Sequence, residues 1–191
     1  MRNAVSDKLA ERGQRELLEQ YLTWTIIEDP VAESASAQAA SSPTNAGRKK
    51  EYRQRFDQWC RGRSIERDGR GAEHPATGHL PRFNFCVLVD DTCLETFRKW
   101  EHWVEAGRQG QEPIVAMILL DANCDQYGNG RMNFPVVEGC TREYTGWMYA
   151  DVRSIPGLYD KLHYGGLTDG PGDYARPPLV YPGHQHGARI S

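Results

Sequence analysis

The run FNFCVLVD, residues 83–90, carries the strongest structural signal in the chain. Apolar side chains occupy both its odd and its even positions, a pattern typical of a strand that is buried on both faces. The pattern predicts a central strand with Leu88 on its buried inner side.

A helix and a second strand are predicted directly after this run. Thr92 and Glu95 have the spacing of a capping box, which predicts a helix to about Ala106. The segment PIVAMILLD, residues 113–121, then has the apolar character of another buried strand. A strand, a helix and a strand in this order predict a βαβ unit with parallel strands and a right-handed crossover. On the inner face of the helix we expect Cys93, Phe97, Trp100 and Val104.

Further elements complete an α+β domain over residues 81–166. TGWMYADV, residues 145–152, alternates like a strand, and Ser154 begins a short helix that ends near His163. We therefore expect a small mixed sheet that contains one βαβ unit, with helices mainly on one face. Residues 167–191, rich in Pro, Gly and His, are expected to form a tail that is extended along the surface or loose.

Two helices are expected before this domain. Periodic apolar positions predict an N-terminal helix within residues 1–30, and residues 31–47 have the composition of a flexible Ala/Ser linker. Residues 48–80 are predicted to form a basic helix and a polar loop, and an aromatic stripe would dock the helix onto the domain. Its members are Tyr52, Phe56 and Trp59.

Composition limits the class of protein. The chain has 191 residues, of which 39% are hydrophobic, enough for one domain of ordinary size. The five cysteines form no C-x-x-C pair, which favours free thiols in a reducing compartment, the cytoplasm or the nucleus. No segment has the length of a membrane span, so no membrane partner is expected. The formal net charge of −3 predicts no partner by itself.

Three carboxylates suggest a cation site. Asp90 and Asp91 follow the first strand, and Asp121 ends the second. If the strands are parallel, these side chains meet at one edge of the sheet, where open α/β sheets place ligands. One hypothesis is therefore a divalent-cation-dependent enzyme. The alternative is that the carboxylates only cap a helix and form a turn.

A basic segment suggests nucleic acid as another possible partner. Lys49, Lys50, Arg53 and Arg55 begin a run of basic residues at 48–70, interleaved with the aromatic stripe. Such a surface could bind a phosphate backbone. The alternative is that the aromatic side chains pack inward and leave the basic ones as a solvated face.

The leading hypothesis is a non-enzymatic binding or assembly module that acts through protein contacts, with a protein partner or by self-association. Motifs for nucleophilic catalysis, phosphate binding or dinucleotide binding are missing from the sequence, so no catalytic residue is assigned and no cofactor is expected. Trp103 should point away from the inner face of its helix, where either the N-terminal helices or a partner could cover it.

Three segments carry a resemblance to known sequences: LPRFNFCVLVDDTCL (80–94), PVVEGCTREYTGWMYADV (135–152) and ARPPLVY (175–181). They resemble uncharacterised proteins of filamentous fungi over roughly residues 80–182. The resemblance implies no activity, cofactor or site residue.

Overall fold

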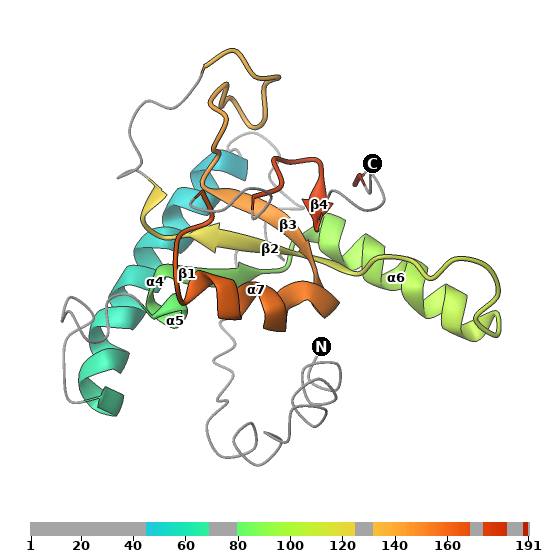
Figure 1. The fold of residues 1–191 in the computed structure, drawn as a ribbon, viewed down its shortest axis with the longest axis horizontal. Helices are drawn as coiled ribbons and strands as arrows, with labels where there is room; N and C mark the ends of the chain where they lie inside the picture. Colours follow the sequence, from blue (N-terminus) through green and yellow to red (C-terminus); the bar gives the residue numbers. More distant parts are fainter. Residues whose placement is uncertain (1–44, 69–79, 125–131, 169–173, 183–188, 191) are drawn as a thin grey trace, which may run out of the picture.

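A mixed four-stranded sheet organises the chain, as the computed structural model shows (Figure 1). The structure describes residues 45–68, 80–124, 132–168, 174–182 and 189–190. Helices pack against the sheet, so the α+β class predicted from the sequence is confirmed. The helix predicted within residues 1–30, and the linker up to residue 44, lie outside the described residues.

The sheet has the strand order β1-β2-β3-β4. These strands are Phe85–Leu88, Ala116–Asp121, Trp147–Asp151 and Val180–Tyr181. β1 and β3 each pair antiparallel with β2, whereas β4 pairs parallel with β3. Every residue of β2 and β3 is buried, so these two strands form the centre of the sheet.

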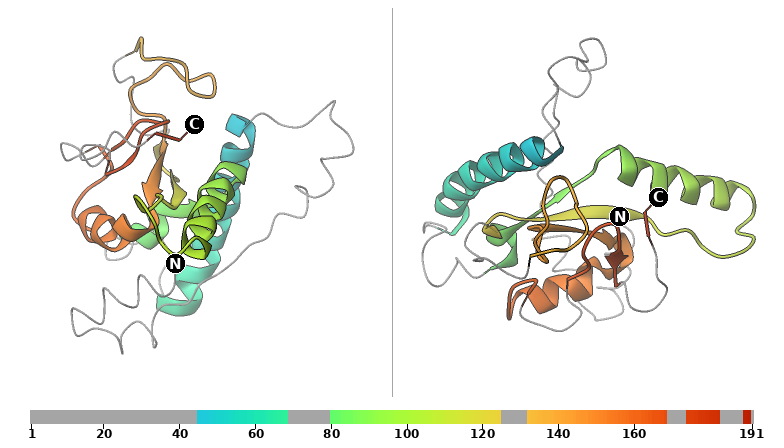
Figure 2. Two further views of the ribbon diagram at one scale, coloured as in Figure 1. Left: turned by 90° about the vertical axis from the view of Figure 1, so that its right-hand side faces the viewer. Right: turned by 90° about the horizontal axis from the view of Figure 1, so that it is seen from above.

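The predicted parallel arrangement of the first two strands is wrong. Phe85 pairs with Asp121 and Leu88 with Ile118, so β1 and β2 are antiparallel. Between them, helix α6 (Asp91–Glu105) extends away from the sheet and residues 106–115 lead back to it (Figure 2). The chain therefore re-enters the sheet at the end that it left, which is the geometry of an antiparallel pair.

β1 lies at the edge of the sheet, which corrects its prediction as a central strand. Leu88 is half-buried, and the side chain of Val87 is 38% exposed. Leu88→Ala should therefore cost less than the 2–5 kcal/mol or so of a fully buried leucine. The apolar residues of the segment 83–90 are therefore explained by partial burial on both faces of β1, and not by a central position in the sheet.

Helices cover both faces of the sheet. Helix α4 (Asn45–Asp68) and α6 lie on one side, and helix α7 (Ile155–Leu162) lies on the other (Figure 2). α4 and α6 thus agree with the expectation of helices mainly on one face, whereas α7 lies on the opposite face. Two short elements complete the helices, α5 (Pro81–Asn84) and the 3₁₀ helix η3 (Val152–Ser154).

The core consists of one apolar layer on each face of the sheet. The layer beneath α7 contains Leu119, Met148, Ala150, Leu158, Leu162, Leu167, Ala175 and Tyr181. The layer beneath α4 and α6 contains Cys93, Ala116, Ile118, Leu120, Trp147, Tyr149 and Val180. Because Leu167, Ala175, Val180 and Tyr181 belong to these layers, the core extends beyond residue 166.

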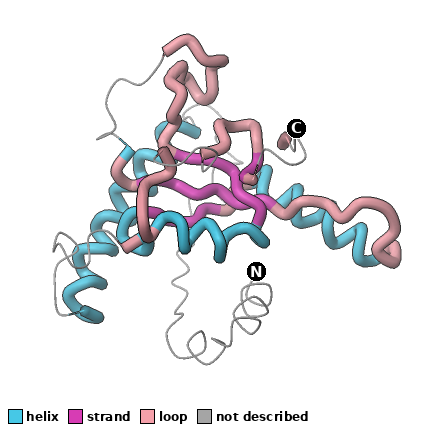
Figure 3. Tube along the Cα trace, in the orientation of Figure 1, coloured by secondary structure: helices cyan, strands magenta, loops and turns pink. Residues whose placement is uncertain are grey.

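Helix α4 is longer than predicted, and the loops are long. α4 begins at Asn45, within the predicted linker, and continues to Asp68. The segments 106–115 and 132–146 extend from the sheet mostly as loops and turns (Figure 3). Both segments contribute side chains to the sites described below.

Candidate functional site: a groove beside helix α6

The three carboxylates of the predicted cation site do not meet. Asp90 and Asp91 follow the end of β1 at Leu88, whereas Asp121 pairs with Phe85 at the opposite end of that strand. The prediction that they share a sheet edge is therefore wrong, because it depended on parallel strands. In the described part of the chain, no group of three or more His, Cys, Asp or Glu side chains could hold a metal ion.

The first carboxylate caps a helix. A side-chain oxygen of Asp90 accepts a hydrogen bond from the backbone N–H of Cys93 at 2.9 Å, at the start of α6. The cap is therefore Asp90 rather than Thr92, two residues earlier than predicted. Asp91 lies exposed in the first turn, where a negative charge interacts favourably with the helix dipole.

Asp121 stabilises the loop that follows β2. Its carboxylate is 1% exposed and accepts hydrogen bonds from the Tyr144 hydroxyl at 2.5 Å and from the Asn123 N–H at 2.7 Å. Burial raises the pKa of the carboxyl, and the bonds from Tyr144 and Asn123 and the nearby charge of Arg53 oppose that rise. These contacts form an Asx-type turn, the alternative that the sequence left open.

Arg53 joins helix α4 to the same end of the sheet. Its guanidinium donates to the backbone carbonyls of Asp121 at 2.8 Å and Gly146 at 3.0 Å. Gly146 has a φ of +76°, and a Cβ there would lie 2.5 Å from the Cβ of Cys124 and 2.7 Å from Nη2 of Arg53. The positive charge therefore attaches a helix to the sheet.

Lys49 has a similar structural role. The residue is 6% exposed, its ammonium lies 2.6 Å from Oε1 of Glu138, and it stands 3.9 Å from the centre of the Trp147 ring. Lys50, by contrast, is exposed, and Arg55 forms an ion pair with Glu51 at 2.5 Å at the surface. Two of the four basic residues proposed to bind nucleic acid are thus engaged within the fold.

The buried thiols are poor nucleophiles. The five cysteines are free, as predicted. Burial raises the pKa values of Cys60, Cys86 and Cys93 to about 12. At neutral pH these three side chains remain protonated, and a thiol must lose its proton to act as a nucleophile.

Helix α6 extends beyond the sheet and carries the candidate Trp103. This side chain is half-buried, and its buried indole N–H has no hydrogen-bond partner within the described ranges of the chain. Trp100 is also half-buried, and its N–H donates to Glu112 at 3.3 Å. Phe97, predicted to face inward, is 42% exposed and stacks on Trp100 with ring centres 5.9 Å apart. The outer half of α6 thus presents a partly exposed aromatic cluster.

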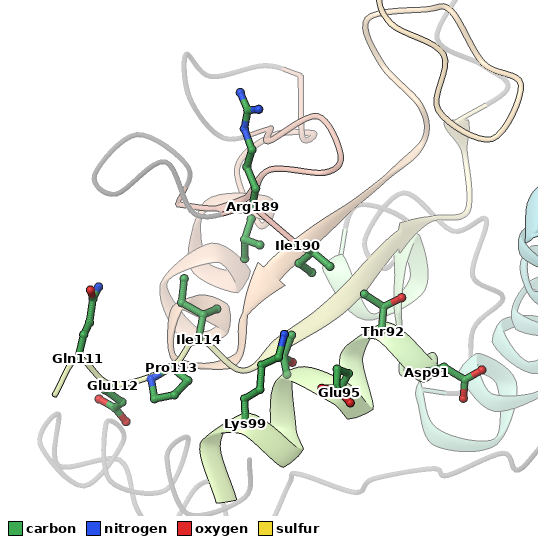
Figure 4. A pocket seen from close by; sticks show the side chains of 12 residues that line it. Asp91, Thr92, Glu95, Lys99, Gln111, Glu112, Pro113, Ile114, Arg189 and Ile190 are labelled. Carbon is green, nitrogen blue, oxygen red and sulfur yellow. The ribbon is translucent and has the colours of Figure 1, made fainter. Parts of the chain in front are cut away.

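A groove lies between α6, residues 111–114 and residues 189–190 (Figure 4). Its volume is about 610 Å³. Ile114, Val180 and Ile190 give it an apolar wall, and the side chain of Lys99 rises from α6 toward it. The remaining lining residues are Asp91, Thr92, Glu95, Thr96, Gln111, Glu112, Pro113 and Arg189.

Residues 189–190 line the groove as an extended segment. Leu179 and Arg189 form an isolated antiparallel bridge, and the N–H of Ile190 donates to the carbonyl of Pro178 at 3.0 Å. The side chain of Ile190 packs against the core layer beneath α6. Sequence reasoning missed this groove because its walls come from segments far apart in the chain, and no local pattern marks it.

Comparisons with known proteins identify no relative. No protein-family model, curated protein or solved structure matches the chain. Among the helices of the described residues, none has the length and apolar character needed to cross a membrane.

Proposed function

We propose that the protein is a non-enzymatic binding or assembly module that acts through protein contacts, and that the groove beside α6 binds an extended peptide. The observation that carries this proposal is the position of Arg189 and Ile190. A piece of extended chain already lines the groove through a backbone bridge and an apolar side chain.

The contacts of this segment are similar to those by which strand addition binds a peptide. In that mode, backbone hydrogen bonds supply affinity and a pocket for a side chain supplies specificity. The bridge between Leu179 and Arg189 is the backbone part, and Ile190 is the apolar anchor. A partner peptide would therefore carry an aliphatic side chain at the position that Ile190 now occupies.

Charges of both signs along the rim favour a peptide over a nucleic acid. Asp91, Glu95 and Glu112 line the groove together with Lys99 and Arg189. Carboxylates repel a phosphate backbone, whereas a mixed rim can pair with the mixed charges of a peptide. The basic segment of α4 is a weaker candidate because Lys49 and Arg53 are engaged within the fold.

Two further expectations accompany this proposal. Trp103 stays the candidate for a protein contact on the outer half of α6, since tryptophan is enriched among residues that dominate binding energy. The free thiols suit a reducing compartment, the cytoplasm or the nucleus.

A peptide titration tests the groove. The probe is a fluorescent peptide with the sequence of residues 186–191, HGARIS, added to the wild-type chain and to an Ile190→Asp variant. The substitution should release the resident segment, so the variant should bind the peptide at least about tenfold more tightly than the wild type, in which the tethered segment competes. Fluorescence anisotropy reports the binding.

Two controls make the result specific. Adding Ile114→Asp to the variant should abolish binding by placing a charge on the apolar wall, whereas adding Val136→Asp, at a position 68% exposed elsewhere, should leave binding unchanged. Failure of the Ile190→Asp variant to bind, or equal binding of a peptide that itself carries Asp in place of Ile190, would contradict the proposal.

A further inference from the structure

We propose that the open edge of β1 pairs antiparallel with β1 of a second copy of this chain, so that one sheet continues across a dimer. This surface belongs to β1, and the proposal does not depend on peptide binding in the groove.

The edge of β1 offers unpaired backbone groups. The N–H of Ala122 donates to the carbonyl of Asn84, and the N–H of Asp121 donates in the other direction, to Gly146 of the segment before β3. Successive residues of a strand direct their backbone N–H and C=O groups to opposite sides. The backbone groups of Asn84, Cys86 and Leu88 therefore face β2. The backbone groups of Val87 therefore point out of the sheet, and in the described part of the structure no hydrogen bond reaches them.

Among the residues that the structure describes, this edge lacks the features that usually prevent association. Natural edge strands are commonly protected by Lys, Pro, a bulge or a covering element. The residues from Phe83 to Val89 include no charged side chain and no proline. Val87 is 38% exposed and Val89 58% exposed, so apolar side chains reach solvent beside the free backbone groups.

The strand is complementary to itself in an antiparallel register. With a two-fold axis at Val87, the outward backbone groups of Val87 in the two copies exchange hydrogen bonds, and Phe85 of one copy lies opposite Val89 of the other. Cys86 then lies opposite Leu88. Each cross-strand pair is apolar, and such pairs stabilise neighbouring strands.

The apolar pairs of this register favour a second copy as the occupant, because β1 supplies the complementary residues on both sides. The register ends where helix α5 (Pro81–Asn84) and the α6 cap Asp90 flank the strand. A two-fold pairing requires only this one surface, used by both copies. Since β1 has four residues, the contact is small, and we expect a dissociation constant at or above roughly 1 μM.

Sedimentation equilibrium tests the dimer with a matched pair of variants. The full wild-type chain should show a weight-average mass that rises with concentration from that of a monomer toward that of a dimer. Val87→Lys places a charge at the two-fold axis and should remove this rise, whereas Val136→Lys, the same change at another exposed valine, should retain it. A wild-type mass that stays monomeric to roughly 1 mM, or association by Val87→Lys equal to that of the wild type, would overturn the proposal.

A cross-link provides a second measurement, because it traps the paired state covalently. Directly opposed residues of a hydrogen-bonded antiparallel pair have Cα atoms about 5.5 Å apart, within the range of a disulfide. Val87→Cys should therefore form a covalent dimer on mild oxidation, several-fold faster than Val136→Cys. Equal rates for the two variants would contradict the register. Neither outcome affects the peptide titration, so the two proposals can fail separately.

Discussion

At the scale of single residues, polar side chains that the sequence suggested as binding residues stabilise the fold. Asp121 accepts hydrogen bonds from Tyr144 and Asn123, and Arg53 donates to two backbone carbonyls at the same end of the sheet. Their residue types could be read from the sequence, but their partners could not. Each partner depends on which strands are neighbours, and that information is not local.

Gly146 allows this arrangement, which leads to a prediction. Gly146→Ala should lower the free energy of unfolding by at least about 1 kcal/mol more than Gly139→Ala. Both glycines have positive φ, +76° and +81°, so both variants carry the strain of a left-handed backbone. Only at Gly146 would the new Cβ meet Cys124 and Arg53, because nothing lies within 4 Å at Gly139.

Urea denaturation of the two alanine variants measures the difference. Equal losses of stability would mean that the close approach of Arg53 to Gly146 is relieved by a small shift, and that the contact contributes little to the attachment of α4.

At the scale of elements, helix α4 is attached to the sheet by basic side chains. Lys49→Ala should lower the free energy of unfolding by about 1.5–3 kcal/mol, since it removes a charged hydrogen bond to Glu138 and a contact with the Trp147 ring. Lys50→Ala, its exposed neighbour, should change stability by less than about 0.5 kcal/mol. Chemical denaturation of both variants provides the test.

The same pair of variants separates this account from the nucleic-acid hypothesis. If α4 bound a phosphate backbone through both lysines, the two substitutions would weaken retention on RNA similarly and alter its salt dependence. Similar losses of RNA binding, with no difference in stability between the variants, would contradict the structural role of Lys49.

The sequence predicts the existence of most elements better than their arrangement. The apolar runs at 83–90 and 113–121 locate two strands because burial requires apolar side chains wherever a strand lies. Their relative direction depends on the return path of residues 106–115, and the polar stretch at 107–112 is equally compatible with either direction. The predicted cation site was wrong for the same reason, since Asp90 and Asp121 would meet only if the two strands were parallel.

At the scale of the whole molecule, the two proposed binding surfaces belong to opposite edges of the sheet. The groove beside α6 adjoins β4, whereas the open edge belongs to β1, and the strand order separates β1 from β4 by two strands. A dimer formed through β1 would therefore leave the β4 side of each groove uncovered. Such a molecule would present two copies of a peptide site, as suits an assembly protein.

The most direct test of this account is an amide NMR spectrum of the wild-type and Ile190→Asp chains, recorded with the HGARIS peptide and over a dilution series. Added peptide should shift the amide signals of Thr92, Thr96, Ile114 and Val180 in the variant, and dilution should shift those of Val87 and Val89. Peptide-induced shifts confined to residues outside the groove, or no shift at saturating peptide, would contradict the proposal that the protein binds extended peptides beside α6.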